Sequence, residues 1–258
     1  MKFLKKNIKF IAIFLIGMII GSTVSVYAAY SYLAQDVSYT KSDGTEISVK
    51  EALDQLYSKE NSESIPTSLN LAGWYADVDD NGSVDGVIFI DLAQGASGNW
   101  NPGNNSWAAS NNTGVYSYSA VTSGLRSYKI STKTSSYSGK FGTKSVIVPN
   151  GTSGSPRFYV MALSNFDSHT HDWYDAKSKT QTVGSVTFRL PSKEEWAAFG
   201  GQLGITTSNY SSSYGLSNWY WSSTEYDSSD AWGADVRYVF MGTSYKANST
   251  YVRLCATF

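Results

Sequence analysis

The sequence predicts a mixed α+β domain that is built mostly from short strands and long loops, with few helices. Aromatic residues make up 15% of the 258 residues and charged residues only 16%, which is typical of an exported, β-rich protein rather than of a disordered chain. Short segments rich in β-branched and aromatic residues alternate with loops of Gly, Ser, Asn and Thr. Helical spacing of apolar residues is confined to a few segments.

The pattern of residues 1–29 predicts an export segment. A lysine-rich start precedes an uncharged stretch from Phe10 to Ala29, which is about the length needed to cross a bilayer. Val26–Ala28 fits a small-residue cleavage site, so a cleaved signal peptide and a retained membrane anchor both remain open. The N-terminal lysines favour a cytoplasmic start in either case. We therefore expect the remainder of the protein to be extracellular or on the cell surface.

Residues 30–68 are predicted to contain a short helix and a polar linker. In "ISVKEALDQLYSKEN", Ser48 and Glu51 have the spacing of a capping box. The apolar stripe of this helix consists of Val49, Leu53, Leu56 and Tyr57. The polar segment "SKENSESIPTS" then leads into the main domain, which we place at residues 69–258.

The main domain contains several predicted strands and one predicted helix. The helix lies in "PSKEEWAAFGGQLG", where Ser192 and Glu195 have capping-box spacing and Gly204 gives a stop signal. Its inward residues are expected to be Trp196, Phe199 and Leu203. The strands are expected at residues 86–93, 145–149, 157–164, 185–191, 219–223, 234–240 and 251–258. In residues 234–240, the alternation predicts one face carrying Ala234, Val236, Tyr238 and Phe240.

The segment "DVDDNGSVDG" has the spacing of a calcium-binding loop. Its candidate ligands occupy alternating positions around Gly82 and are Asp77, Asp79, Asn81 and Asp85. A calcium loop of this kind needs a carboxylate at its twelfth position, where this chain has Ile88. An Asx-rich turn before a strand explains the same residues without an ion. A structural calcium site and a metal-free turn both remain open, and we expect no required cofactor.

Other sites for chemistry are weakly supported by the sequence. His169 and His171 could ligate zinc with nearby aspartates, although a polar loop explains them equally well. No nucleophile elbow or phosphate-binding glycine loop occurs, and Cys255 is the only cysteine, so no intrachain disulfide can form. Beyond the first nine residues the chain has 16 basic against 21 acidic residues, which disfavours a nucleic-acid partner. We therefore do not expect an enzyme.

Three motifs near the C-terminus carry a family resemblance. They are "FRLPSKEEW", "YWSSTEYDSSDAW" and the final "YVRLCATF". In this order they resemble the C-type-lectin-like fold in its formylglycine-generating-enzyme branch, over roughly Leu69 to Phe258. The resemblance implies short antiparallel strands with long loops. The matching residues are Arg189, Leu190, Pro191, Ser192, Glu195, Trp196, Trp221, Ser222, Ser223, Val252 and Arg253.

Within that branch, the chain is most similar to the variable proteins of diversity-generating retroelements. In that family, adenine-directed reverse transcription rewrites residues near the C-terminus, which here corresponds to about residues 219–258. The oxidising enzymes of the branch use a pair of active-site cysteines, and this chain has only one. The sugar-binding triplets of calcium-dependent lectins are also absent from the sequence. The resemblance therefore implies binding, and neither sulfatase maturation nor calcium-mediated sugar binding.

The resemblance and the composition of the tail together predict a ligand-binding surface. Trp219, Trp221 and Trp232 are expected to form a rigid aromatic frame, and Glu225 and Lys246 fall outside the set of residues that adenine mutagenesis of Asn codons can reach. Tyr220, Tyr226 and Tyr245 are the expected hot spots. The predicted ligand-binding residues are Tyr220, Thr224, Tyr226, Asp227, Ser228, Ser229, Asp230, Asp235, Arg237, Thr243, Ser244, Tyr245, Asn248, Ser249 and Thr250.

The sequence thus predicts an exported binding protein that recognises an extracellular protein or glycan through its C-terminal region. Diversification by a retroelement is part of this prediction. If the N-terminal segment is retained, the membrane is a second partner. A fixed adhesin or carbohydrate-binding module of the same fold is the alternative, and a metal-dependent enzyme using His169 and His171 is a third hypothesis.

Overall fold

The computed structural model describes residues 38–40, 44–48, 64–101 and 105–258. The chain divides into two compact units, residues 1–63 and 64–258. In the first unit, β1 (Ser38–Thr40) pairs antiparallel with β2 (Glu46–Ser48), so Ser48 ends a strand. The predicted export segment, residues 1–29, and the rest of the predicted helix after Ser48 lie outside the described residues. No helix among the described residues is long and apolar enough to span a membrane.

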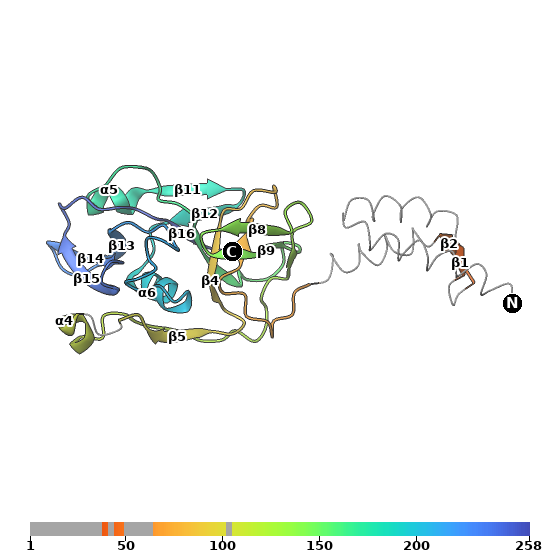
Figure 1. Cartoon of the computed structure of the whole chain (residues 1–258), viewed down its shortest axis with the longest axis horizontal. Coiled ribbons are helices and arrows are strands. Elements are labelled where there is room, and N and C mark those ends of the chain that lie inside the picture. The colour runs from red at the N-terminus through yellow and green to blue at the C-terminus, as the bar shows by residue number, and fades with distance from the viewer. Residues whose placement is uncertain (1–37, 41–43, 49–63, 102–104) are drawn as a thin grey trace. The chain divides into compact units, whose positions relative to one another are not determined.

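The second unit is a mixed α+β domain, and the predicted predominance of strands over helices is confirmed (Figure 1). Its described helices are α4 (Ser106–Ser110), α5 (Trp173–Ser178) and α6 (Lys193–Gln202). A nine-stranded sheet forms the centre, in the order β11-β12-β16-β10-β4-β3-β9-β7, with β8 paired to β9. All pairs in this sheet are antiparallel except β3 with β9.

The strands of the central sheet include the four that the sequence predicts before the C-terminal region. Predicted residues 86–93, 145–149, 157–164 and 185–191 correspond to β4, β9, β10 and β12, with shorter or shifted ends. The strands are β3 (Tyr75–Ala76), β4 (Gly86–Asp91), β7 (Tyr128–Ile130), β8 (Ser136–Gly139), β9 (Gly142–Pro149), β10 (Phe158–Ala162), β11 (Thr180–Val183), β12 (Val186–Arg189) and β16 (Cys255–Thr257).

The central strand β4 separates two apolar clusters. Every residue of β4 is buried, and its alternating side chains place Val87 and Phe89 in one cluster and Ile88 in the other. The first cluster includes Trp196 and Phe199 of α6. A helix with so many buried positions packs closely, and a Cβ added at Gly200 would lie 2.1 Å from the Trp100 ring.

The predicted capping box of α6 is confirmed. Ser192 is the N-cap, and its hydroxyl accepts a hydrogen bond from the Glu195 amide (3.2 Å). The Glu195 carboxylate accepts in return from the Ser192 amide (2.6 Å) and also binds both terminal nitrogens of Arg189. The start of α6 is therefore fixed to the end of β12.

A second sheet carries most of the C-terminal region. It has the order β13-β14-β15, with β13 (Trp219–Glu225), β14 (Asp230–Asp235) and β15 (Phe240–Tyr245). The hairpin of β5 (Ala96–Asn99) and β6 (Val115–Tyr118) forms a separate two-stranded sheet. In Figure 1, β13, β14 and β15 lie at the end of the domain away from β8 and β9.

The prediction of one continuous strand over residues 234–240 is wrong. The chain reverses between β14 and β15, and Asp235 pairs with Phe240 across the turn. The Asp235 carboxylate accepts a hydrogen bond from the Arg237 amide (3.1 Å), and Val239 has a φ of 57°, so the backbone cannot continue as a strand. Tyr238 is consequently exposed and shares no face with buried Val236. The predicted terminal strand 251–258 is shortened to β16.

Three indole groups hold β13 in place. Trp196 donates its indole N–H to the carbonyl of Trp221 (3.0 Å), and Trp173 donates to the carbonyl of Ser222 (2.8 Å). Trp221 itself donates to the carbonyl of His171 (2.9 Å). These rings are buried, so each combines apolar packing with a satisfied polar atom. Of the three tryptophans predicted for the frame, Trp221 is buried, whereas Trp219 and Trp232 are half-buried.

Candidate ligand-binding face

Two segments of the C-terminal region, residues 224–230 and 243–249, meet at the end of the β13–β15 sheet. Asp230 at the start of β14 pairs with Tyr245 at the end of β15, and the Lys246 amide donates to the Ser229 carbonyl (2.9 Å). The Asn248 side chain donates to the Ser244 hydroxyl (3.0 Å). We call the surface they form the C-terminal face; its residues are Thr224, Tyr226, Asp227, Ser228, Ser229, Asp230, Thr243, Ser244, Tyr245, Asn248 and Ser249.

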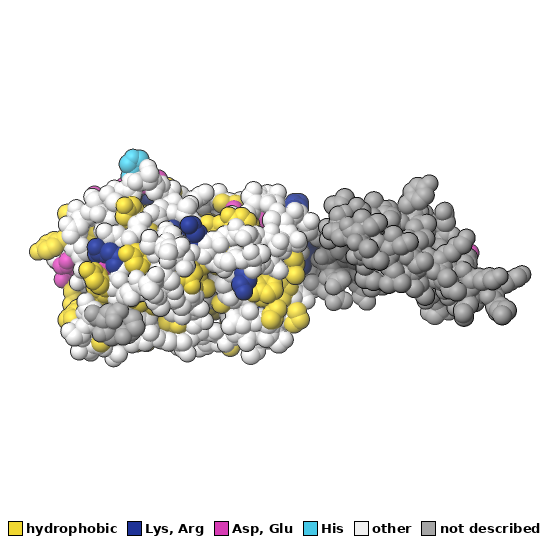
Figure 2. Space-filling model, viewed as in Figure 1, with side chains coloured by type: hydrophobic (Ala, Val, Ile, Leu, Met, Phe, Trp, Pro, Cys, Tyr) yellow, Lys and Arg dark blue, Asp and Glu magenta, His cyan; other side chains and the backbone are white. Residues whose placement is uncertain are grey.

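The predicted outward orientation holds for the tips of both segments. Tyr226 is 53% exposed and Tyr245 is 65% exposed. At the end of the domain that carries β14 and β15, apolar and acidic side chains lie next to one another in the space-filling view (Figure 2). Asp227, Ser228, Ser229, Asn248 and Ser249 are also exposed, whereas Thr224, Asp230, Thr243 and Ser244 are half-buried.

Three predicted ligand-binding residues do not point into solvent, and this part of the prediction is wrong. Tyr220 is buried against the Trp196 ring (5.0 Å between centroids), and its hydroxyl donates to the Asn165 side chain (3.0 Å). Thr250 is buried because its backbone exchanges two hydrogen bonds with that of His171. Asp235 is the third, and its buried carboxylate binds a neighbouring arginine.

Asp235 and Arg237 lie apart from the C-terminal face. They form a salt bridge (2.9 Å) at the turn between β14 and β15. Asp230 is five residues away along β14, which corresponds to roughly 17 Å in an extended strand. Half-buried Arg237 therefore belongs to the opposite end of the sheet from Tyr226 and Tyr245, and the predicted set of ligand-binding residues is split in two.

The loop between β13 and β14 has a defined shape. The Asp227 carboxylate accepts hydrogen bonds from the amides of Ser229 and Asp230, both at 2.8 Å, and from the Ser229 hydroxyl at 3.0 Å. These hydrogen bonds, the one from the Ser229 amide above all, lower the pKa of Asp227. The loop is thus an Asx turn, which small polar residues favour.

Lys246 holds the same loop closed from its buried side. Its side chain is buried, and the ammonium donates to the Glu225 carboxylate and to the carbonyls of Asp227 (2.6 Å) and Ser228 (3.0 Å). The hydrogen bond from Lys246 lowers the pKa of Glu225. The sequence gives no indication that Glu225 and Lys246 bind each other, because 21 residues separate them.

An aromatic group next to the C-terminal face includes a residue that sequence reasoning missed. The exposed ring of Trp107, from α4, stacks on Trp232 (6.3 Å between centroids), and Tyr226 contacts Trp232 edge-on (5.3 Å). The Lys193 ammonium lies 4.3 Å from the Trp232 ring centre. Trp107 follows a loop of Asn and Gly residues, and only the three-dimensional fold brings it to the tail.

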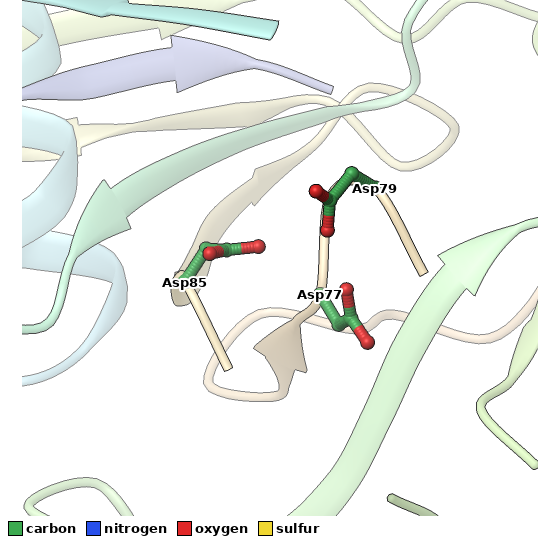
Figure 3. A group of neighbouring side chains, drawn as sticks. All are labelled: Asp77, Asp79 and Asp85. Carbon is green, nitrogen blue, oxygen red and sulfur yellow. The ribbon is translucent and has the colours of Figure 1, made fainter. Parts of the chain in front are cut away.

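The predicted calcium-type loop joins β3 to β4, and it brings three carboxylates together (Figure 3). Ligand oxygens of Asp77, Asp79 and Asp85 all lie within 4.8 Å of one another. Burial raises the pKa of Asp77 and of Asp85, against hydrogen bonds that lower it. Such a group of oxygens could hold a hard cation.

The same loop is also held together by hydrogen bonds within the protein. The Asp77 carboxylate accepts from the amides of Asn81 (3.0 Å) and Gly82 (2.7 Å), and the Asp85 carboxylate accepts from the Val78 amide (2.8 Å). The Asn81 side-chain oxygen accepts a hydrogen bond from the Ser83 amide, which makes a further Asx turn. The geometry is compatible with both hypotheses that the sequence left open.

The structure does not bring the two histidines onto a common metal position. The two ring nitrogens of His171 lie 2.6 Å from the Asp175 carboxylate and 3.0 Å from the Asp167 carboxylate. His169 is exposed, and its ring lies 3.9 Å from Asp167. Across the described part of the chain, the only group of three His, Cys, Asp or Glu side chains with metal-ligand spacing consists of Asp77, Asp79 and Asp85. The zinc-enzyme hypothesis therefore gains no support from the segment that carries His169 and His171.

The environment of His171 raises the pKa of its imidazole. Burial lowers the pKa of His171, but the hydrogen bonds to Asp167 and Asp175 outweigh it, so the pKa is raised above its ordinary value. The hydrogen bond to His171 in turn lowers the pKa of Asp167. This ion-paired group lies beside β13, because the His171 carbonyl accepts from the Trp221 indole.

Cys255 is not placed to act as a nucleophile. It is buried in β16, and its sulfur lies 3.4 Å from the Glu195 carboxylate. Burial raises the pKa of the Cys255 thiol well above its ordinary value, so the reactive thiolate is disfavoured.

The chain matches no protein-family model, and no curated protein matches it.

Proposed function

We propose that this protein is an exported, non-catalytic binding protein whose C-terminal face recognises an extracellular protein or glycan. One observation carries the proposal: Tyr226–Ser229 and Tyr245–Ser249 adjoin each other, with exposed side chains at their tips, on a buried aromatic frame. Tyrosine supplies contact area at low entropic cost, and the small polar residues around it supply adaptable hydrogen bonds.

The frame beneath the C-terminal face does not depend on the exposed side chains. Burying each large aromatic residue, such as Trp196 or Trp221, contributes about 2–3 kcal/mol. The exposed side chains at Ser228 and Asn248 bury little area, so replacing them alters recognition more than folding. This separation of folding from recognition supports the proposal that the face is diversified.

For the fold, we propose the C-type-lectin-like architecture of the formylglycine-generating-enzyme branch. Contacts among the motif residues support it: Arg189 binds Glu195, and Trp196 donates to the carbonyl of Trp221. The Ser222 hydroxyl also donates to the carbonyl of Trp232 (2.8 Å), which ties β13 to β14. The motifs that suggested the resemblance are thus joined in space.

The diversification proposal is tested with the gene. Codons for the Ser and Thr residues of the C-terminal face should end in a pyrimidine. A near-copy of the segment, rich in Asn codons, should lie beside a reverse-transcriptase gene. A complete genome without such a copy would remove the diversification proposal and leave the binding proposal standing.

The binding proposal is tested with the full chain on a glycan array and on an array of extracellular proteins. We expect Tyr226→Ala and Tyr245→Ala to weaken binding at least about tenfold. Tyr238→Ala is the matched control, because Tyr238 is similarly exposed but lies at the opposite end of β14. Binding that survives both face substitutions would rule out this face and favour a fixed adhesin or carbohydrate-binding module that uses another surface.

A further inference from the structure

Arg253 is a buried arginine that forms no ion pair with any described residue. It lies just before β16 and is 2% exposed. Its Nη2 donates to the Asn165 side chain (3.1 Å) and to the Gly215 carbonyl at a long 3.5 Å. The Nε and Nη1 atoms are buried, and no atom of the described residues accepts a hydrogen bond from them. A guanidinium group has five N–H donors, so most of its hydrogen-bonding capacity is unused.

The same domain shows what a buried arginine normally requires. Arg157 is 1% exposed, and its Nε and Nη2 donate to the two oxygens of the buried Asp91 carboxylate at 2.8 and 2.7 Å. The carbonyl of Leu69 accepts a further hydrogen bond from Nη2 (2.9 Å). Arg157 thus has a full negative charge and several acceptors, whereas Arg253 has only two neutral oxygens.

No acidic side chain of the described residues forms a salt bridge with Arg253, and the carboxylate of Asp235 is already engaged by Arg237. The centre of the Tyr220 ring lies 5.8 Å from the guanidinium carbon. Burial lowers the pKa of Arg253, with the Tyr220 phenol opposing that effect. Because arginine stays protonated in proteins, this site keeps a buried positive charge that needs a partner.

We propose that Arg253 binds a small inorganic anion, of the size of chloride or bromide, through the N–H groups of Nε or Nη1. The small size follows from burial, since only 2% of Arg253 is exposed and an organic ligand could not reach it from the surface. The anion would neutralise the charge at a point where Asn165, Gly215 and Tyr220 meet. It is independent of the ligand proposed for the C-terminal face.

The first test is thermal unfolding of the full chain at constant ionic strength, with sodium chloride or bromide replacing sodium gluconate. We expect the unfolding temperature to rise with halide concentration and to saturate, as for a single binding site. Arg253→Lys, which keeps the charge but lacks the guanidinium donors, should lose this dependence. Arg237→Lys is the matched control and should retain it, because the carboxylate of Asp235 already pairs with Arg237.

The second test is bromide anomalous scattering from crystals of the unaltered protein, which does not require Arg253→Lys to fold. The expected result is a bromide peak within hydrogen-bonding distance of Nε or Nη1 of Arg253. The absence of that peak at saturating bromide overturns the proposal, whatever the stability measurements show. A halide effect that Arg253→Lys retains in full overturns it as well.

Discussion

The buried ammonium group of Lys246 donates a hydrogen bond to the carboxylate of Glu225, and this contact closes the loop that carries Tyr226. Two backbone carbonyls, of Asp227 and Ser228, accept from the same ammonium group. One buried cation thus fixes the loop between β13 and β14 from inside, while the loop's own side chains face solvent.

We expect Lys246→Met to destabilise the domain by about 1–3 kcal/mol, because it removes a buried ammonium that donates to the carbonyls of Asp227 and Ser228. Glu225→Gln should cost less, since Glu225 is largely exposed and keeps an acceptor. Lys144→Met, at an exposed lysine of β9, is the control. The measurement is denaturant unfolding, and equal stability of Lys246→Met and the unaltered protein would contradict the role of this contact.

Substitutions in the ion pair of Arg157 and Asp91 should lower the stability of the domain far more. Asp91→Asn leaves a buried guanidinium without its counter-charge, which is expected to cost about 3–5 kcal/mol. The double change Asp91→Asn with Arg157→Met should recover part of this loss in a double-mutant cycle. As a control, Asp80→Asn alters a partly exposed ion pair with Lys133, 3.8 Å long, and should change stability little. A loss no larger than that of the control would show that the buried pair is dispensable.

His171 predicts a pH dependence of stability. Its folded-state pKa is raised above the ordinary value of about 6.5, chiefly because hydrogen bonds to Asp167 and Asp175 outweigh burial. The stability that His171 contributes is therefore fully present below pH 6.5 and is lost as pH rises through the raised pKa. Lys179, which binds Asp175, opposes protonation without reversing the shift.

Unfolding free energies measured between pH 5.5 and 8.5 check this expectation, a range chosen to bracket the ordinary histidine pKa of about 6.5. We expect His171→Gln to remove the decline with rising pH that the unaltered protein shows. His169→Gln should leave the decline intact, because His169 is exposed. A decline of the same size in His171→Gln would assign the pH dependence to other groups.

The aspartate-rich loop between β3 and β4 is expected to keep its shape without a metal. Backbone amides already donate to the carboxylates of Asp77 and Asp85, so a chelator should leave the unfolding temperature unchanged. The opposite result, a rise on adding calcium that is absent from Asp79→Asn, would show that the three carboxylates bind the ion. Thermal unfolding in chelator and in calcium at neutral pH distinguishes the two.

The raised pKa values in this loop also give a sign for its pH dependence. Because burial raises the pKa of Asp77 and Asp85 in the folded state, their contribution to stability is greatest below about pH 3.8, the ordinary Asp value, and is lost as pH rises through the raised values. Asp85→Asn should flatten this decline while retaining an oxygen acceptor for the Val78 amide. An unchanged decline in Asp85→Asn would contradict this account.

Local signals in the sequence were sufficient for α6 and for four strands of the central sheet, β4, β9, β10 and β12. Ser192 and Glu195 identify the start of α6 because a capping box depends only on residues three positions apart. The β-branched run in β4 identifies a buried strand for the same local reason.

The turn between β14 and β15 could not be recognised from its composition. Val236, Tyr238 and Val239 favour strands, and the reversal depends on the Asp235 side chain and on a positive φ at Val239. The burial of Tyr220 follows from its position on the inner face of β13, whose register depends on pairing with β14. The pairing of β13 with β14 is not encoded within a few neighbouring residues, since it joins residues as distant as Trp219 and Asp235.

The features that shape the candidate site are mostly long-range. Lys246 and Glu225 are 21 residues apart, and Asp91 and Arg157 are 66 apart. Residue types alone indicate that such charges need partners when buried, but they do not indicate which partner. For Arg253 the sequence suggested only a family motif, and its unmatched charge emerges from its surroundings.

The stacked rings of Trp107 and Trp232 have a practical consequence. One ring is exposed beside Tyr226, whereas Trp173, Trp196 and Trp221 are enclosed in the core. The enclosed indoles supply a steady background of ultraviolet emission. A molecule that arrives next to Tyr226 would change the surroundings of Trp107 and Trp232, so intrinsic fluorescence offers a label-free optical signal of occupancy.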